Sequence, residues 1–123
     1  MPIDAERARA ISALRFRALG DETRLRILEL LATGERTVSE LQHGIEVGQS
    51  LMSHHLRILR EAGIVADRRE GRWVYYGIVE PALAAAKLTL YELDPIRSHQ
   101  GDGLLGTGSR PRPQESVPRS PSP

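Results

Sequence analysis

Residues 49–65 carry an apolar stripe and a polar stripe interleaved at helical spacing. Met52, Leu56 and Leu59 recur at i, i+4 and i+7, which predicts the buried face of an amphipathic helix. The residues between them are amides, hydroxyls, an imidazole and a guanidinium, with no acid before Glu61: Gln49, Ser50, Ser53, His54 and Arg57. A helix whose outer face offers donors without carboxylates suits the major groove of DNA, whereas an ordinary solvated face mixes Glu with Lys.

The position of each polar residue on this helix predicts a role in DNA contact. Gln49 and Ser50 stand at the start of the helix, the end that reaches base edges, and a Gln side chain can pair bidentately with adenine. Ser53 and His54 are assigned to base or phosphate contacts one turn further on. Arg57 is placed for a phosphate, which gives affinity without sequence information. The alternative is that Gln49 and Ser50 only solvate a helix terminus.

The flanking segments predict the elements that position this helix. Helical spacing predicts helices over residues 4–19, 22–32 and 81–93, the second of them central and buried, with Asp21 as its N-cap. Thr37 and Glu40 fit a capping box, which begins a short helix just before the polar-faced one. A short helix, a tight turn and a polar-faced helix together form a helix–turn–helix.

From Ile64 onward the sequence pattern changes from helical to strand-like. Two β-favouring runs, 64–69 and 72–78, flank the dipeptide Glu70-Gly71 and predict a tight β-hairpin. Strand alternation favours Trp73, Tyr75 and Tyr76 as core and cross-strand partners over platforms for stacked bases. The predicted order is therefore α-α-α-α-β-β-α, a mainly α fold with a β-hairpin wing: a winged helix–turn–helix.

Composition limits the classes of function. The 123 residues predict one domain over 1–99 and a disordered Gly/Pro/Ser-rich tail over 100–123, which holds five of the eight prolines. The absence of Cys excludes disulfides and thiolate metal sites, and the net charge of +1 does not by itself indicate a nucleic-acid partner. No apolar run approaches the ~20 residues of a membrane span, so we expect a cytoplasmic protein with no membrane partner.

Four segments resemble the ArsR/SmtB family of winged-helix repressors. In chain order they are Leu19–Leu28, Thr37–Leu41, Met52–Gly63 and Arg69–Tyr76, and the match covers roughly residues 10–93 in the same order and spacing. The resemblance implies a homodimer that binds double-stranded operator DNA with an inverted repeat and represses transcription until an inducer, here unknown, releases it.

The resemblance also implies where the dimer and the wing make their contacts. Family dimers pair through the first and last helices, whose apolar positions here are Ile11, Leu14, Leu83, Ala86, Leu90 and Leu93. Family wings approach the DNA backbone or minor groove, for which Arg69 and Arg72 are the candidates and Arg68 a weaker one. The alternatives are intrachain packing for the leucines and a solvated hairpin tip for the arginines.

Neither a metal site nor an enzyme is predicted. Metal-sensing members of the family carry Cys near the positions of Thr37 and Ser39, or histidines on the last helix, and this chain has hydroxyls and no His there. No cofactor is expected, and two alternatives stay open: a repressor with a non-standard His/carboxylate metal site, and a winged-helix protein-interaction module without DNA binding. Ser53 beside His54 and His55 is not a catalytic pair, because such close neighbours on a helix do not face each other. His55 adjoins the apolar stripe and is expected to pack.

Overall fold

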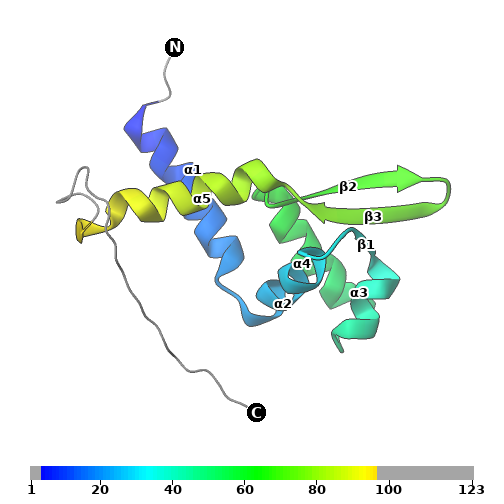
Figure 1. Ribbon diagram of the computed structural model, residues 1–123. Coiled ribbons are helices and arrows are strands. Elements are labelled where there is room, and N and C mark those ends of the chain that lie inside the picture. The colour runs from blue at the N-terminus through cyan, green and yellow to red at the C-terminus, as the bar shows by residue number, and fades with distance from the viewer. Residues whose placement is uncertain (1–3, 97–123) are drawn as a thin grey trace. The chain divides into compact units, whose positions relative to one another are not determined.

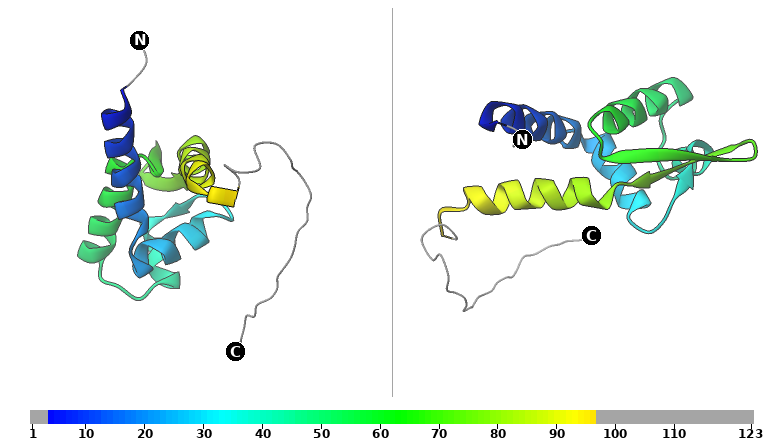
Figure 2. Two further views of the ribbon diagram at one scale, coloured as in Figure 1. Left: turned by 90° about the vertical axis from the view of Figure 1, so that its left-hand side faces the viewer. Right: turned by 90° about the horizontal axis from the view of Figure 1, so that it is seen from above.

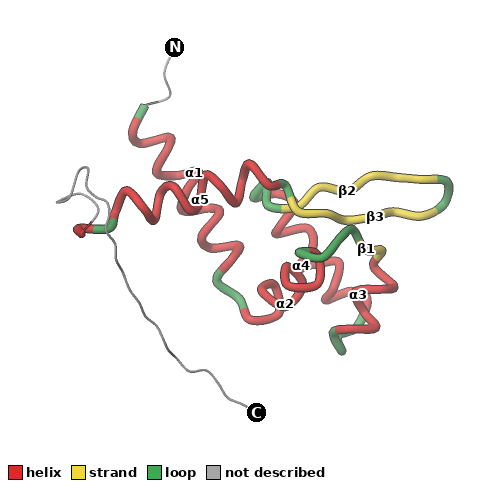
Figure 3. Tube along the Cα trace, viewed as in Figure 1, coloured by secondary structure: helices red, strands yellow, loops and turns green. Residues whose placement is uncertain are grey.

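The computed structural model of the protein describes residues 4–96 and is mainly helical with a small antiparallel sheet, as predicted (Figures 1 and 3). The chain divides into two units, residues 1–87 and 88–123, and the packing below concerns the first. The elements are α1 (Ala5–Leu19), α2 (Glu22–Leu31), β1 (Arg36–Thr37), α3 (Val38–Gly44), α4 (Gln49–Glu61), β2 (Val65–Glu70), β3 (Trp73–Ile78) and α5 (Glu80–Leu93).

Helices α2 and α3 begin where the sequence places capping side chains. The Asp21 carboxylate accepts a hydrogen bond from the Arg24 amide at 3.0 Å and so starts α2. At α3 the Thr37 hydroxyl accepts from the Glu40 amide at 3.2 Å, while Glu40 accepts from the Thr37 amide at 2.9 Å. Gly63 follows α4 with φ of +76°, the left-handed conformation that glycine adopts at little cost. These predicted boundaries are confirmed.

The sheet has three antiparallel strands in the order β1-β3-β2, of which β1 was not predicted. Thr37 pairs with Tyr75, so β3 lies beside the start of α3. In the hairpin Glu70 pairs with Trp73, which moves the turn one residue beyond the expected dipeptide, onto residues 71–72. A two-residue turn of type II′ needs a positive φ at its first central residue, and Gly71 has φ of +62°.

The hydrophobic core gathers one side of α4 against α2, α3 and the start of β2. Its largest fully buried side chains are Ile27, Leu41, Ile45, Met52, Leu56, Leu59, Ile64 and Val65. The predicted buried stripe of α4 is therefore confirmed. The expectation that α2 is central and buried is wrong for Leu25, which is 47% exposed, whereas Ile27, Leu28 and Leu31 of the same helix are buried.

Arg24 joins three helices of this unit through one guanidinium group. Its Nε donates to the Ala18 carbonyl at 2.6 Å and its Nη2 to the Arg17 carbonyl at 3.3 Å, both in the last turn of α1. The last carbonyls of a helix lack partners within the helix and favour a nearby cation. Nη1 contacts Nδ1 of His55 on α4 at 3.1 Å, so the end of α1 and the middle of α4 are held by the same side chain.

The elements that carry the predicted DNA contacts lie together. In Figures 1 and 2, α3, α4 and the hairpin of β2 and β3 occupy one end of the first unit, while the N-terminal half of α1 lies away from the hairpin turn. The hairpin extends beyond the helices, so no helix covers its turn. This arrangement presents a helix and a wing on the same side of the domain.

Replacing Arg24 should weaken the packing of α1 and α4 on α2. We expect Arg24→Gln to lower the free energy of unfolding by about 2 kcal/mol, because hydrogen bonds from a charged group to buried or partly buried acceptors contribute on that order. Urea denaturation followed by circular dichroism measures the change. Arg26→Gln is the matched control, since Arg26 is an exposed cation on the same helix. Equal stability of the two variants would contradict the role assigned to Arg24.

Candidate nucleic-acid interface

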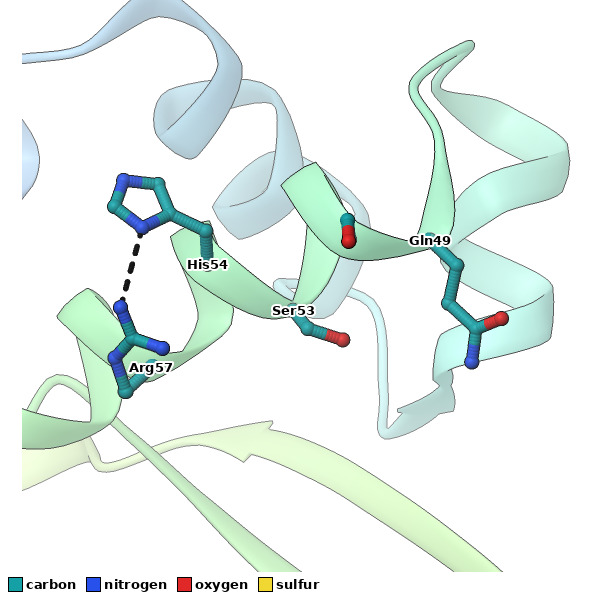
Figure 4. Close-up of a pocket in the computed structure, with 5 residues that line it drawn as sticks. Gln49, Ser53, His54 and Arg57 are labelled. Atoms are coloured by element: carbon teal, nitrogen blue, oxygen red, sulfur yellow. Dashed lines mark hydrogen bonds between the residues drawn. The ribbon is translucent and has the colours of Figure 1, made fainter.

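The structure brings the five predicted helix residues together on one surface. All five are exposed and line one shallow depression of about 430 Å³ (Figure 4). We call the surface formed by Gln49, Ser50, Ser53, His54 and Arg57 the outer face of α4. At about 100° per residue these side chains span an arc of roughly 140°, opposite the buried stripe. No acidic residue stands in the first turn of α4 or among the residues that line the depression.

The hydrogen bond between Arg57 and His54 determines which ring nitrogen of His54 can donate on the outer face. An Nη atom of Arg57 lies 3.3 Å from Nδ1 of His54 (Figure 4). A guanidinium can only donate, so Nδ1 accepts and the ring hydrogen is assigned to Nε2. The outer face therefore offers a cation and an N–H donor at one end, with hydroxyls and an amide that both donate and accept at the other.

His55, the neighbour of His54, belongs to the core, as predicted. It is 7% exposed, and Nδ1 accepts from Arg24 while lying 3.9 Å from the Asp21 carboxylate. Burial is the main cause that lowers the pKa of His55; Asp21 opposes that shift, whereas Arg24 and His54 add to it. The Arg24 backbone amide is the main cause that lowers the pKa of Asp21. His55 thus packs as a neutral acceptor.

The three arginines of the wing, Arg68, Arg69 and Arg72, differ in their contacts with the rest of the protein. Arg68 donates to Glu35 at 2.8 Å and to Glu70 at 2.7 Å, and its guanidinium lies 4.8 Å from the ring centre of Tyr75. These partners raise the pKa of Arg68 and commit it to bracing the hairpin. Arg69 and Arg72 are exposed near the hairpin turn, outside the depression that α4 forms.

The comparisons with known proteins decide the family. A model described as "Bacterial regulatory protein, arsR family" matches residues 21–67. The biofilm growth-associated repressor of Agrobacterium fabrum is 35% identical over 94 residues, which cover 76% of this chain and 80% of that repressor. The chain belongs to the arsR family. The family consists of DNA-binding transcriptional regulators, so the prediction that the chain is not an enzyme is confirmed.

Two further relatives of this arsR-family chain define how far the likeness extends. The arsenic resistance transcriptional regulator ArsR1 of Pseudomonas putida is 53% identical over 62 residues, which cover 50% of this chain but only 48% of that protein. The solved structure of an ArsR-like transcriptional regulator from Rhodococcus is 28% identical, covers 74% of this chain and 86% of that one, and superposes with a TM-score of 0.67. The winged helix–turn–helix fold is thereby confirmed.

The described part of this arsR-family chain has neither a group of metal ligands nor a helix that could span a membrane. Within residues 4–96, no three His, Cys, Asp or Glu side chains gather as a group that could hold a metal ion. The Thr37 hydroxyl is used as a helix cap. None of the helices in this part of the chain is both long and apolar enough to cross a bilayer. His99 and the predicted tail over 100–123 lie outside the described residues.

The predicted dimer residues fall into two groups. Ile11 and Leu14 on α1 are 41% and 44% exposed, and Leu90 and Leu93 on α5 are 58% and 71% exposed. Ala86 is 6% exposed and Leu83 packs against the hydrophobic core, so these two contribute to the fold of their own chain. Four of the six predicted dimer residues are therefore exposed, and two belong to the packing of the chain itself.

The sequence pattern missed the exposure of Trp73. The expectation that Trp73 packs in the core is wrong, since it is 51% exposed, although it does pair with Glu70 across the hairpin. Tyr76 packs against the core and Tyr75 lies under Arg68, as strand partners do. The alternation of residues along a strand separates two faces but does not tell which face is covered near a hairpin turn. No signal in the sequence distinguished Trp73 from the tyrosines.

The lowered pKa of His55 predicts a pH-dependent stability. A pKa that is lower in the folded state means that the neutral ring contributes stability, which is fully present above the ordinary value of 6.5 and is lost as the pH falls through the folded pKa. We expect the melting temperature to fall by a few degrees between pH 7.5 and pH 5, and to fall less in His55→Gln. The exposed His43→Gln is the matched control. A wild-type profile that does not change below pH 6.5 would argue against a buried neutral His55.

Proposed function

We propose that the protein is a dimeric, sequence-specific repressor of ArsR type that binds an inverted-repeat operator through α4 and the wing of β2 and β3. The observation that carries this proposal is the outer face of α4, where five polar, non-acidic side chains share one surface. Family membership supports DNA as the partner. The name of the Agrobacterium fabrum relative supports repression as the direction of control.

The outer face of α4 is long enough to present several side chains to the DNA major groove. Gln49 and Arg57 are eight residues apart on one helix, so they are separated by about 12 Å along its axis. The major groove of B-DNA is wide enough to admit an α-helix, and three or four side chains of a recognition helix reach base edges there. Gln49 and Ser53 then face base edges, and Arg57 faces the phosphates at the rim of the groove.

The exposed arginines of the wing supply the second contact. Arg69 and Arg72 stand near the hairpin turn, and the turn extends beyond the helices (Figure 1). A cation in this position reaches the phosphate backbone, or the minor groove next to the major groove that α4 occupies. Arg68 braces the hairpin instead, because its guanidinium is already paired with the carboxylates of Glu35 and Glu70.

A second copy of the chain accounts for the exposed apolar residues on the terminal helices. Ile11, Leu14, Leu90 and Leu93 expose between 41% and 71% of their surface, an unfavourable arrangement in a monomer. A two-fold dimer sets two recognition helices about 34 Å apart, which is one DNA turn and requires an inverted repeat.

Two substitutions on α4 separate sequence recognition from phosphate contact. We expect Gln49→Ala to weaken binding to a duplex selected from a random pool by about tenfold, with random duplex unaffected, because a bidentate amide–adenine pair contributes roughly 1–3 kcal/mol of discrimination. Arg57→Ala should weaken binding to both duplexes and lower the salt slope by about one. Fluorescence anisotropy at several salt concentrations measures both effects.

The control for these variants is Arg9→Ala, which removes an exposed cation from α1. It should leave the affinity for both duplexes as in the wild type. Unchanged affinities for Gln49→Ala and Arg57→Ala together would refute the docking of α4 in the major groove.

A charge on α5 tests the dimer. We expect Leu93→Glu to raise the dimer dissociation constant by at least about 100-fold, because the dimer loses the burial of two leucines, one from each protomer, at roughly 1.5–3 kcal/mol each. Sedimentation equilibrium measures the constant. Ala84→Glu introduces the same charge at an exposed position on the same helix and should dimerise normally. A wild-type protein that stays monomeric at micromolar concentration would defeat the proposed assembly.

A further inference from the structure

A second hollow, of about 370 Å³, lies between the start of α3, the start of α4 and β3. We call it the helix–wing groove. Ser39 and Gln42 line it from α3, Gln49 from α4, and Trp73 with Val74 from the wing. The pairing of β1 with β3 brings these segments together, because Thr37 pairs with Tyr75 immediately before α3 begins. Gln49 also lines the outer face of α4, so it borders both hollows.

The position of Trp73 in this groove calls for an explanation. Its side chain is 51% exposed although a tryptophan gains more from burial than most residues. The guanidinium of Arg72 lies 5.5 Å from its ring centre, a cation–π distance that keeps a positive charge beside the groove. The ring thus offers a flat apolar surface, an N–H donor and a neighbouring cation to an occupant.

The rest of the lining suits an anionic chain with apolar parts. Among the described residues that line the groove, none is acidic. Ser39 presents an exposed hydroxyl. Gln42 donates to the Val47 carbonyl at 3.2 Å and so holds the turn that leads into α4. Neutral donors, an apolar ring face and a flanking guanidinium match the phosphate oxygens and deoxyribose of a nucleic-acid backbone.

We propose that the helix–wing groove holds the sugar–phosphate backbone of duplex DNA, with Trp73 and Ser39 as direct contacts. This inference rests on the proposed function. A helix in the major groove and a wing at the next minor groove are separated by one phosphate backbone, and that backbone must pass between them. In this protein the space between α4 and the wing is the helix–wing groove. Ser39 and the Trp73 indole N–H donate to phosphate, and the ring face packs on deoxyribose.

The fluorescence of Trp73 tests the proposal directly, because it is the chain's one tryptophan. The probe is a duplex that the wild-type protein has selected from a random pool, with anisotropy of labelled DNA recording binding in parallel. We expect the acrylamide quenching constant of Trp73 to fall by about half at saturating duplex. An unchanged constant with a saturated anisotropy signal overturns the groove proposal and leaves the proposed function intact. No binding of any duplex overturns both.

Single-stranded DNA of the same sequence distinguishes backbone contact from base stacking. Protection of Trp73 by the single strand at equal or lower concentration would overturn the proposal in favour of stacked bases. Protection by the duplex alone supports it.

Substitutions in the groove give a second readout. We expect Ser39→Ala and Trp73→Ala each to weaken binding to selected and random duplex alike by about fivefold, with an unchanged salt slope, because a neutral donor to phosphate releases no counterion. Trp73→Phe keeps a ring face and should recover part of the loss. The exposed Arg9→Ala on α1 is the control, and melting temperatures confirm folding. Wild-type affinity in both alanine variants overturns the proposal.

Discussion

The burial of one side of α4 is the constraint on which the functional surface depends. Met52, Leu56 and Leu59 are all fully buried, and each contributes roughly 1.5–3 kcal/mol by leaving water. Turning the helix by one residue, about 100°, would bring this stripe to the surface and polar groups into the core. The core therefore fixes the rotation of α4, and with it the direction in which Gln49 and Arg57 project.

A polar contact supplements this apolar constraint. Arg24 binds the last carbonyls of α1 and the His55 ring of α4, so it links the N-terminal helix to the helix with the outer face. The two adjacent histidines consequently have different environments. His55 is buried as an acceptor for Arg24, while His54 is exposed and accepts from Arg57. Their positions one residue apart on a helix account for the difference, because they lie about 100° apart.

The sequence predicted those parts of the structure that local signals determine. The Asp21 cap, the capping box of Thr37 and the apolar stripe of α4 depend on residues a few positions apart, and all were found as expected. The strand β1 was missed because two residues carry no periodicity, and it forms only through pairing with β3. The exposure of Trp73 was missed for a related reason, since it depends on which elements cover the end of the hairpin.

The chemistry of the two hollows explains how a chain with a net charge of only +1 can suit DNA. The outer face of α4 contains one arginine, and the lining of the helix–wing groove contains neutral residues with Arg72 beside it. Under the proposed function most contacts are thus hydrogen bonds from amides, hydroxyls, an imidazole and an indole. Such groups contribute through geometry and leave little non-specific attraction. Because hydrogen bonds require close and correctly oriented partners, the rigid placement of α4 and the wing by the core becomes the source of selectivity.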